Sequence, residues 1–168
     1  MEISEIAELF GRNFKTGNTI FHDLAEDGAL RVLYRIRDWI DGPSILQIKN
    51  YSGEFPIHSV VKWHRGFRAI HLIEVLVQMG ADLNAKAGSS GDTVLHMTTY
   101  GDGDSKLAEW LCEQPQIDLN VRNYARQTAY GLAFKTINLQ LMTILRNSGA
   151  KCETPETSER EESDDEGA

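Results

Sequence analysis

Three histidines stand at similar spacing and are, by residue type, able to bind a metal ion. His22, His58 and His96 are separated by 36 and 38 residues. Imidazole is the commonest side-chain metal ligand, so a repeated histidine invites a zinc interpretation. Each histidine, however, closes its own copy of a short motif, which places the three on different structural units. We therefore expect three mostly buried side chains, each donating hydrogen bonds to backbone and threonine groups within its own unit.

Other residues with chemical potential form no recognisable site. His64 and His71 are seven residues apart and can share a helix face, but no third ligand accompanies them. The Asp102–Asp104 pair lacks the remaining positions of a calcium loop. The two cysteines, Cys112 and Cys152, do not have zinc spacing. Without a phosphate loop, a zinc-protease pair or a serine elbow, the sequence predicts no enzyme, no metal and no cofactor.

The histidines belong to a repeated hexamer, seen most clearly from Gly91 to His96. Further copies begin at Gly17 and Gly53, and a fourth, without the histidine, begins at Arg126. Thr19 and Thr93 stand where a helix N-cap is expected, because a threonine hydroxyl can accept a bond from a free N–H of the first turn. A period of 35 to 38 residues indicates stacked helical units, each the size of one supersecondary motif.

The units also end alike, with an apolar helix pattern followed by glycine. Gly80 and Gly149 stand where a left-handed residue would end the second helix. With its hexamer start, this pattern resembles the ankyrin repeat, whose units begin G-x-T-P-L-H. The resemblance implies an all-α solenoid of about four helix-turn-helix repeats with short connecting hairpins. The predicted repeats cover 17–50, 51–86, 87–123 and 124–150, after an N-terminal capping segment (1–16) and before a disordered acidic tail (151–168).

Charge and composition are distributed unevenly along the 168 residues. The net charge is −8, but residues 153–166 alone carry −7, so the repeats are nearly neutral. No apolar run is long enough to span a membrane, and the N-terminus has no signal-peptide pattern. Few cysteines favour an intracellular protein. The acids that define the tail are Glu159, Glu161, Glu162, Asp164, Asp165 and Glu166.

Repeat two carries about four extra residues between its helices, within 62–68. Insertions in repeat proteins map to one face, often the binding face, and Trp and Arg are enriched at interface hot spots. The opposite interpretation is that Trp63 and Phe67 fold down onto the neighbouring helix. The candidate partner-binding residues are Tyr51, Trp63, His64, Arg65, Phe67, Arg68 and Tyr124.

In size, repeat spelling and layout, residues 1–150 resemble the viral ankyrin proteins of polydnaviruses, which are I-kappa-B-like. That resemblance implies a partner, a Rel/NF-kappa-B transcription factor bound through its Rel homology region, in the cytoplasm or nucleus of a host cell. It also implies suppression of the host immune response. The Asp-Ser-Gly degron of cellular I-kappa-B is absent from the sequence, so release by phosphorylation is not expected. The alternative is a general ankyrin adaptor that binds another host protein.

The acidic tail departs from the polydnavirus pattern, in which such a region is generally missing. One interpretation is that its carboxylates cover the basic DNA-binding groove of a Rel protein, since DNA itself is densely negative. A plain solubilising tail and a turnover signal are the other interpretations.

Overall fold

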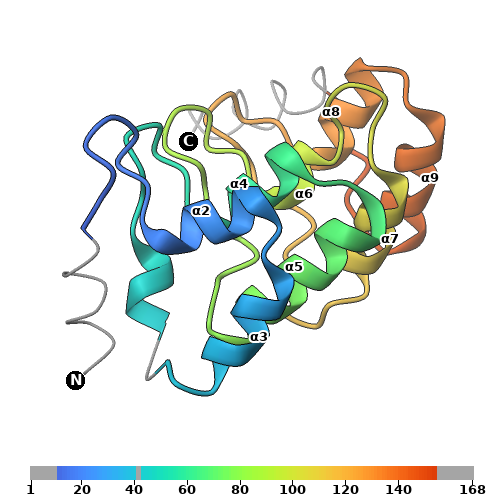
Figure 1. Ribbon diagram of the computed structural model, residues 1–168. Helices are drawn as coiled ribbons and strands as arrows, with labels where there is room; N and C mark the ends of the chain where they lie inside the picture. The colour runs from blue at the N-terminus through green and yellow to red at the C-terminus, as the bar shows by residue number, and fades with distance from the viewer. Residues whose placement is uncertain (1–10, 41–42, 155–168) are drawn as a thin grey trace, which may run out of the picture.

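The computed structural model describes residues 11–40 and 43–154 (Figure 1). This part of the chain contains eight α-helices, one 3-10 helix and no strand. The predicted capping segment lies largely outside it, as do Asp41 and Gly42 and the acidic residues from 155 onward. The elements are α2 (Ile20–Asp27), α3 (Leu30–Arg37), η1 (Pro43–Gln47), α4 (Pro56–Trp63), α5 (Gly66–Gln78), α6 (Val94–Met97), α7 (Ser105–Cys112), α8 (Ala129–Lys135) and α9 (Leu139–Asn147).

The helices form two layers, which confirms the all-α solenoid. The first helices of the repeats, α2, α4, α6 and α8, pack side by side in one layer. The second helices, α3, α5, α7 and α9, form the other layer. Antiparallel pairs such as α4 and α5 join the layers, and hairpin loops connect one pair to the next (Figure 1).

The core lies between the two layers and runs through all four repeats. Leu72, Ile73 and Leu76 of α5 are fully buried, and their spacing places them on one side of the helix. Each such side chain contributes roughly 1.5–3 kcal/mol through removal of apolar surface from water. Equivalent leucines in the neighbouring second helices continue the same core: Leu33, Leu107, Leu111, Leu141 and Leu145.

Two local expectations about repeats one and two are wrong. From the sequence, residues 44–53 are expected to form the hairpin that links repeat one to repeat two. The hairpin begins later, because Pro43–Gln47 forms η1, which buries Ile45 and Leu46. The extra residues of repeat two do not form a loop. They lengthen α5 to 13 residues, against 8 in α3 and in α7, and leave only His64 and Arg65 between α4 and α5.

The hairpin loops contact one another through their backbones. The N–H of Tyr51 donates to the carbonyl of Thr16 (2.9 Å), and Tyr124 donates to Ser90 (2.9 Å). Between the second and third hairpins the contact is closer still, because the N–H of Gly88 donates to the carbonyl of Gly53 at 2.6 Å. A Cβ on Gly88 would lie 2.8 Å from the Cα of Gly53. Glycine at these positions therefore sets the spacing of the two loops.

Beyond α9 the chain contacts the end of repeat three. The N–H of Lys151 donates to Oδ1 of Asn120 (2.8 Å), and Glu153 forms a salt bridge of 2.7 Å with Arg122. Residues 151–154, assigned above to the disordered tail, thus include contacts with the loop that precedes α8.

Candidate partner-binding surface

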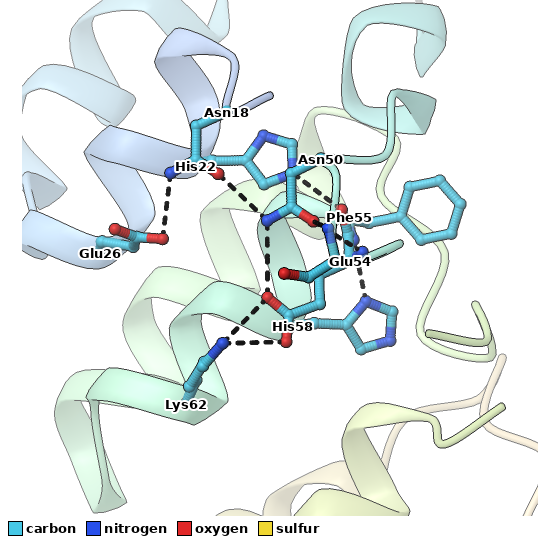
Figure 2. A network of polar contacts seen from close by, with 9 residues as sticks. Asn18, His22, Glu26, Asn50, Glu54, Phe55, His58 and Lys62 are labelled. Atoms are coloured by element: carbon cyan, nitrogen blue, oxygen red, sulfur yellow. Dashed lines mark hydrogen bonds and ion pairs between the residues drawn. The ribbon is translucent and has the colours of Figure 1, made fainter. Parts of the chain in front are cut away.

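Each motif histidine ties the start of its helix to a backbone carbonyl farther along the chain. Nδ1 of His22 accepts the N–H of Thr19 (3.1 Å), and Nε2 donates to the carbonyl of Glu54 (2.9 Å). Figure 2 shows His22 beside the start of α4. Since one ring nitrogen meets a donor and the other a carbonyl, the imidazole must be neutral with its proton on Nε2. The ring therefore completes the cap of α2 and the contact with repeat two.

The other two histidines repeat this arrangement. His58 accepts from Phe55 (3.1 Å) and donates to the carbonyl of Ala85 (3.0 Å), where the next hairpin begins. His96 accepts from Thr93 and donates to Gln127, at 3.2 and 2.9 Å.

The expected threonine contact within the unit is present, because Oγ1 of Thr19 and of Thr93 lies 2.9 Å from the Nδ1 of its histidine, and the Nε2 bond of His58 stays within repeat two. The expectation of bonds donated within one unit is otherwise wrong in two respects. Nδ1 accepts, and the Nε2 bonds of His22 and His96 reach the following repeat. No group of three His, Cys, Asp or Glu side chains in the described residues is placed to hold a metal ion.

The electrostatics of the three histidines follow from this placement. Burial lowers the pKa of His22, His58 and His96, and the carbonyl bond and nearby carboxylates offset only part of that shift. Protonation would give the ring a second N–H, at Nδ1, and this group would face the backbone N–H that Nδ1 now accepts. The neutral ring is thus a condition of the repeat interface.

The predicted caps agree with the structure. Thr19 and Thr93 are the N-cap residues of α2 and α6. Gly80 and Gly149 have positive φ, at 98° and 96°. The hexamer and the terminal glycine are therefore local structural signals and not ligand sites.

A line of polar pairs covers the first-helix layer. In repeat one, Nδ2 of Asn18 donates to Glu26 (3.2 Å), and in repeat two, Nζ of Lys62 donates to Glu54 (3.1 Å) (Figure 2). Both pairs join the second residue of the hexamer to the residue eight positions on. In repeat three, Tyr100 donates to Asp92 at the same two positions.

Asparagines of the hairpins extend these pairs into a network. Nδ2 of Asn50 donates to Oδ1 of Asn18 (3.1 Å) and lies 3.5 Å from Oε2 of Glu54, which links the pairs of repeats one and two. In repeat three, Asn123 donates to Oδ1 of Asp92 (2.8 Å). The side chains are thereby held in fixed orientations before any partner arrives. This network was not predicted, although polar residues recur in the sequence at hexamer position two and eight residues later.

The turn between α4 and α5 exposes two large aromatic side chains. Trp63 is 61% exposed and Phe67 is 63% exposed, so neither folds down onto a neighbouring helix. The ammonium of Lys106 lies 3.9 Å from the centre of the Phe67 ring, a cation–π contact. Arg65, the N-cap of α5, is also exposed. These three residues form the outward side of the turn.

The other two candidates in this turn, His64 and Arg68, contact repeat one. Nε2 of His64 lies 3.0 Å from the carbonyl of Ala25 and 2.9 Å from that of Glu26. The guanidinium of Arg68 is 3.4 Å from the carbonyl of Gly28. Since the last carbonyls of a helix have no partner within it, both side chains satisfy the end of α2. Sequence reasoning could not find this role, because the acceptors lie about forty residues away.

The two candidate tyrosines lie at the hairpin tips. The Tyr51 ring covers Gly17 and the Tyr124 ring covers Gly91, and both rings keep an exposed face. The hairpin meets the start of α4, whereas Trp63 lies at its end, about 12 Å away along an eight-residue helix. The structure therefore separates the candidates into a hairpin group and a turn group.

Comparison with known proteins identifies relatives but no matching family model. I-Kappa-B like protein C2 of Microplitis demolitor bracovirus (isolate Webb) is 33% identical over 141 residues, which cover 83% of this chain and 77% of the relative. I-kappa-B like protein N2 of the same virus is 34% identical over 157 residues, which cover 90% and 84%. I-Kappa-B like protein H1 is 31% identical over 146 residues, which cover 86% and 75%.

A solved structure supports the same fold. The ankyrin repeat domain of Bcl-3, described as a unique member of the IkappaB family, matches with a TM-score of 0.70 and 23% identity. The match covers 83% of this chain and 62% of that one. In the described residues no helix is both long enough and apolar enough to cross a membrane. By sequence and fold, this chain belongs to the polydnavirus I-kappa-B-like ankyrin-repeat proteins, a family that binds other proteins and is not enzymatic.

Proposed function

We propose that this protein binds the Rel homology region of a host Rel/NF-kappa-B transcription factor, holds it inactive and so suppresses the host immune response. Family membership supports protein binding of the I-kappa-B-like kind. The observation that carries the proposal is the exposed turn after α4, where Trp63 and Arg65 point away from the core. Trp and Arg supply much of the binding energy at protein interfaces.

Side-chain contacts on both sides of the exposed turn hold it in place. Lys62 is bound to Glu54 and precedes Trp63 directly, so the turn starts from a fixed point. His64 anchors the opposite side of the turn to repeat one. A preorganised surface loses little conformational freedom on binding, which leaves more of the contact energy as affinity.

The test is direct binding to an insect Rel homology dimer by the wild type and by the Trp63→Ala, Arg65→Ala double variant. We expect at least 10-fold weaker binding, the loss that corresponds to about 1.4 kcal/mol, and an unchanged melting temperature. Trp39→Ala is the matched control, because Trp39 is also exposed but lies beyond α3, in repeat one. Equal affinity of the double variant and the wild type would refute the assignment of this turn.

Competition with kappa-B DNA tests inhibition separately from binding. An inhibitor should give saturable binding that excludes DNA from the Rel dimer. No binding at micromolar concentration would favour the adaptor alternative, and capture of partners from infected cells would follow.

The acidic tail lies outside the described residues, and we propose that it competes with DNA through its charge. Deletion of residues 155–168 keeps the Glu153–Arg122 salt bridge and removes every other acidic residue of the tail. This deletion should reduce inhibition of DNA binding mainly at low salt, because exposed charges are screened as ionic strength rises. Equal inhibition at every ionic strength would leave the tail a solubilising role.

A further inference from the structure

Three exposed apolar side chains lie at or beside the turn between α8 and α9. Phe134 is 44% exposed, Ile137 is 77% exposed and Leu139 is 69% exposed. The turn is closed by bonds from the Ile137 N–H to the Phe134 carbonyl (3.0 Å) and from the Leu139 N–H to the Ile137 carbonyl (3.1 Å). We refer to these three residues as the apolar patch of the turn; a single exposed apolar residue is ordinary, whereas several exposed together often mark an interaction site.

Ile137 occupies this turn against its conformational preference. Its φ is +56°, in the left-handed region that a β-branched residue rarely enters. The corresponding residues of repeats one and three are glycines, Gly28 and Gly103, with φ of 65° and 79°. Because the Ile137 side chain is mostly exposed, burial within the chain does not offset the strain. Strain kept at an exposed position points to a role in binding.

The same turn is covered in the earlier repeats. The guanidinium of Arg68, from repeat two, lies over Gly28, and the side-chain amide of Asn138, from repeat four, lies over Gly103. Each of these turns therefore receives a side chain of the following unit. Among the described residues no following unit covers Ile137. The position that a neighbouring unit contacts in repeats one and three is therefore open in repeat four.

The charge of repeat four suggests the chemistry of its partner. Residues 124–150 contain three basic residues and no acidic residue, and Lys135 is the one at this turn, since Arg126 precedes α8 and Arg146 lies in the last turn of α9. Lys135 is exposed between Phe134 and the turn. The acidic tail, residues 155–168, contains no large apolar side chain and so cannot fill an apolar patch. An apolar segment that is itself acidic matches both properties of this surface.

We propose that the α8–α9 turn is a docking site for an acidic amphipathic helix of a partner protein. Its apolar face would cover Phe134, Ile137 and Leu139, and its carboxylates would face Lys135. This geometry follows the helix-in-groove mode, in which residues at i, i+3, i+4 and i+7 anchor the helix. The inference does not rest on the Rel assignment, since it uses a different repeat and a different ligand.

A synthetic helical peptide tests the proposal by fluorescence anisotropy with the full chain. Its probe has leucine at i, i+3, i+4 and i+7 and mainly glutamate elsewhere, and a second peptide has lysine in place of glutamate. We expect saturable binding of the acidic peptide, and about 10-fold weaker binding by Ile137→Gly, the loss of one anchor. The same variant should melt a few degrees higher, because glycine relieves the positive φ. A purely structural role of Ile137 would not move these two readouts in opposite directions.

Val32→Ala is the matched control, since Val32 is also an exposed β-branched residue but lies in α3. It should leave peptide binding unchanged, whereas Lys135→Glu should weaken it. The proposal is wrong if the acidic peptide does not bind, if the lysine peptide binds as well, or if Ile137→Gly binds like the wild type. Self-association that is abolished by Ile137→Gly would also overturn it, in favour of a second copy of this chain.

Discussion

Mild acid should destabilise this protein through its three motif histidines. Each ring is neutral, buried and bonded on both nitrogens, and burial lowers its pKa in the folded state. In the unfolded chain a histidine takes up its proton near pH 6.5. The unfolded state thus binds more protons below that pH, and stability falls as pH decreases. The stabilisation is complete above about pH 6.5 and is lost progressively below it.

The magnitude follows from the number of histidines. At pH 5.5, proton uptake by the unfolded chain favours unfolding by up to about 1.4 kcal/mol for each histidine that stays neutral when folded. For His22, His58 and His96 together the limit is about 4 kcal/mol, a large part of the stability of an ordinary domain. The carboxyl group of Asp92 does not add to the pH dependence between pH 5.5 and 7.5. Burial raises its pKa, but hydrogen bonds from Ser90, Tyr100 and Asn123 bring the pKa below its ordinary value.

The assay is urea unfolding followed by circular dichroism between pH 7.5 and 5.5. His22→Gln should be less stable at pH 7.5 and should lose about one third of the pH dependence, because one of the three titrations is removed. The control is His71→Gln, which changes an exposed imidazole that contacts only the Phe67 carbonyl of its own helix. A midpoint that stays flat between these pH values would refute the assignment of neutral, buried rings.

Two further predictions concern contacts between repeats. Gly88→Ala should destabilise the fold by about 1–3 kcal/mol, because its Cβ would clash with the Gly53 backbone. Gly101→Ala has open space around it and should show only the smaller penalty of its positive φ. Urea unfolding of both variants gives the comparison, and equal losses of stability would contradict the backbone contact. His64→Ala should cost about 1–2 kcal/mol, since the Glu26 carbonyl loses its side-chain partner and the Ala25 carbonyl keeps only the Gly28 N–H. Hydrogen exchange should rise first in repeat one, and unchanged exchange there would contradict the capping role.

Local features of the fold could be predicted from sequence, whereas contacts between repeats could not. Threonine caps and terminal glycines act on their own helix, so Thr19 and Gly80 are recognisable within a few residues. The acceptor of His22 is the carbonyl of Glu54, and only the stacking geometry brings it within reach. In the same way, residues 44–47 were expected to belong to a hairpin, because the local sequence does not reveal the burial of Ile45 and Leu46.

The candidate site shows the same division. By residue type, Trp63 and His64 were equally good candidates. In the structure Trp63 is exposed, whereas His64 is hydrogen-bonded to the end of α2. Within repeat four alone, Ile137 is one apolar residue among several, and its positive φ cannot be recognised from the local sequence. Comparison of corresponding turns provides that information, since repeats one and three contain glycine at this point.

The Nε2 bonds of His22 and His96, which reach the following repeat, bear on how such arrays change length. Each acceptor is a main-chain carbonyl, which every amino acid supplies, so a unit that carries the histidine makes no demand on the side chains of its successor. Units can then be duplicated, exchanged or allowed to diverge without losing this attachment. In the final unit Gly131 stands at the histidine position. An engineered chain lengthened by a fifth unit should therefore gain from Gly131→His, which would restore the donor at the new junction.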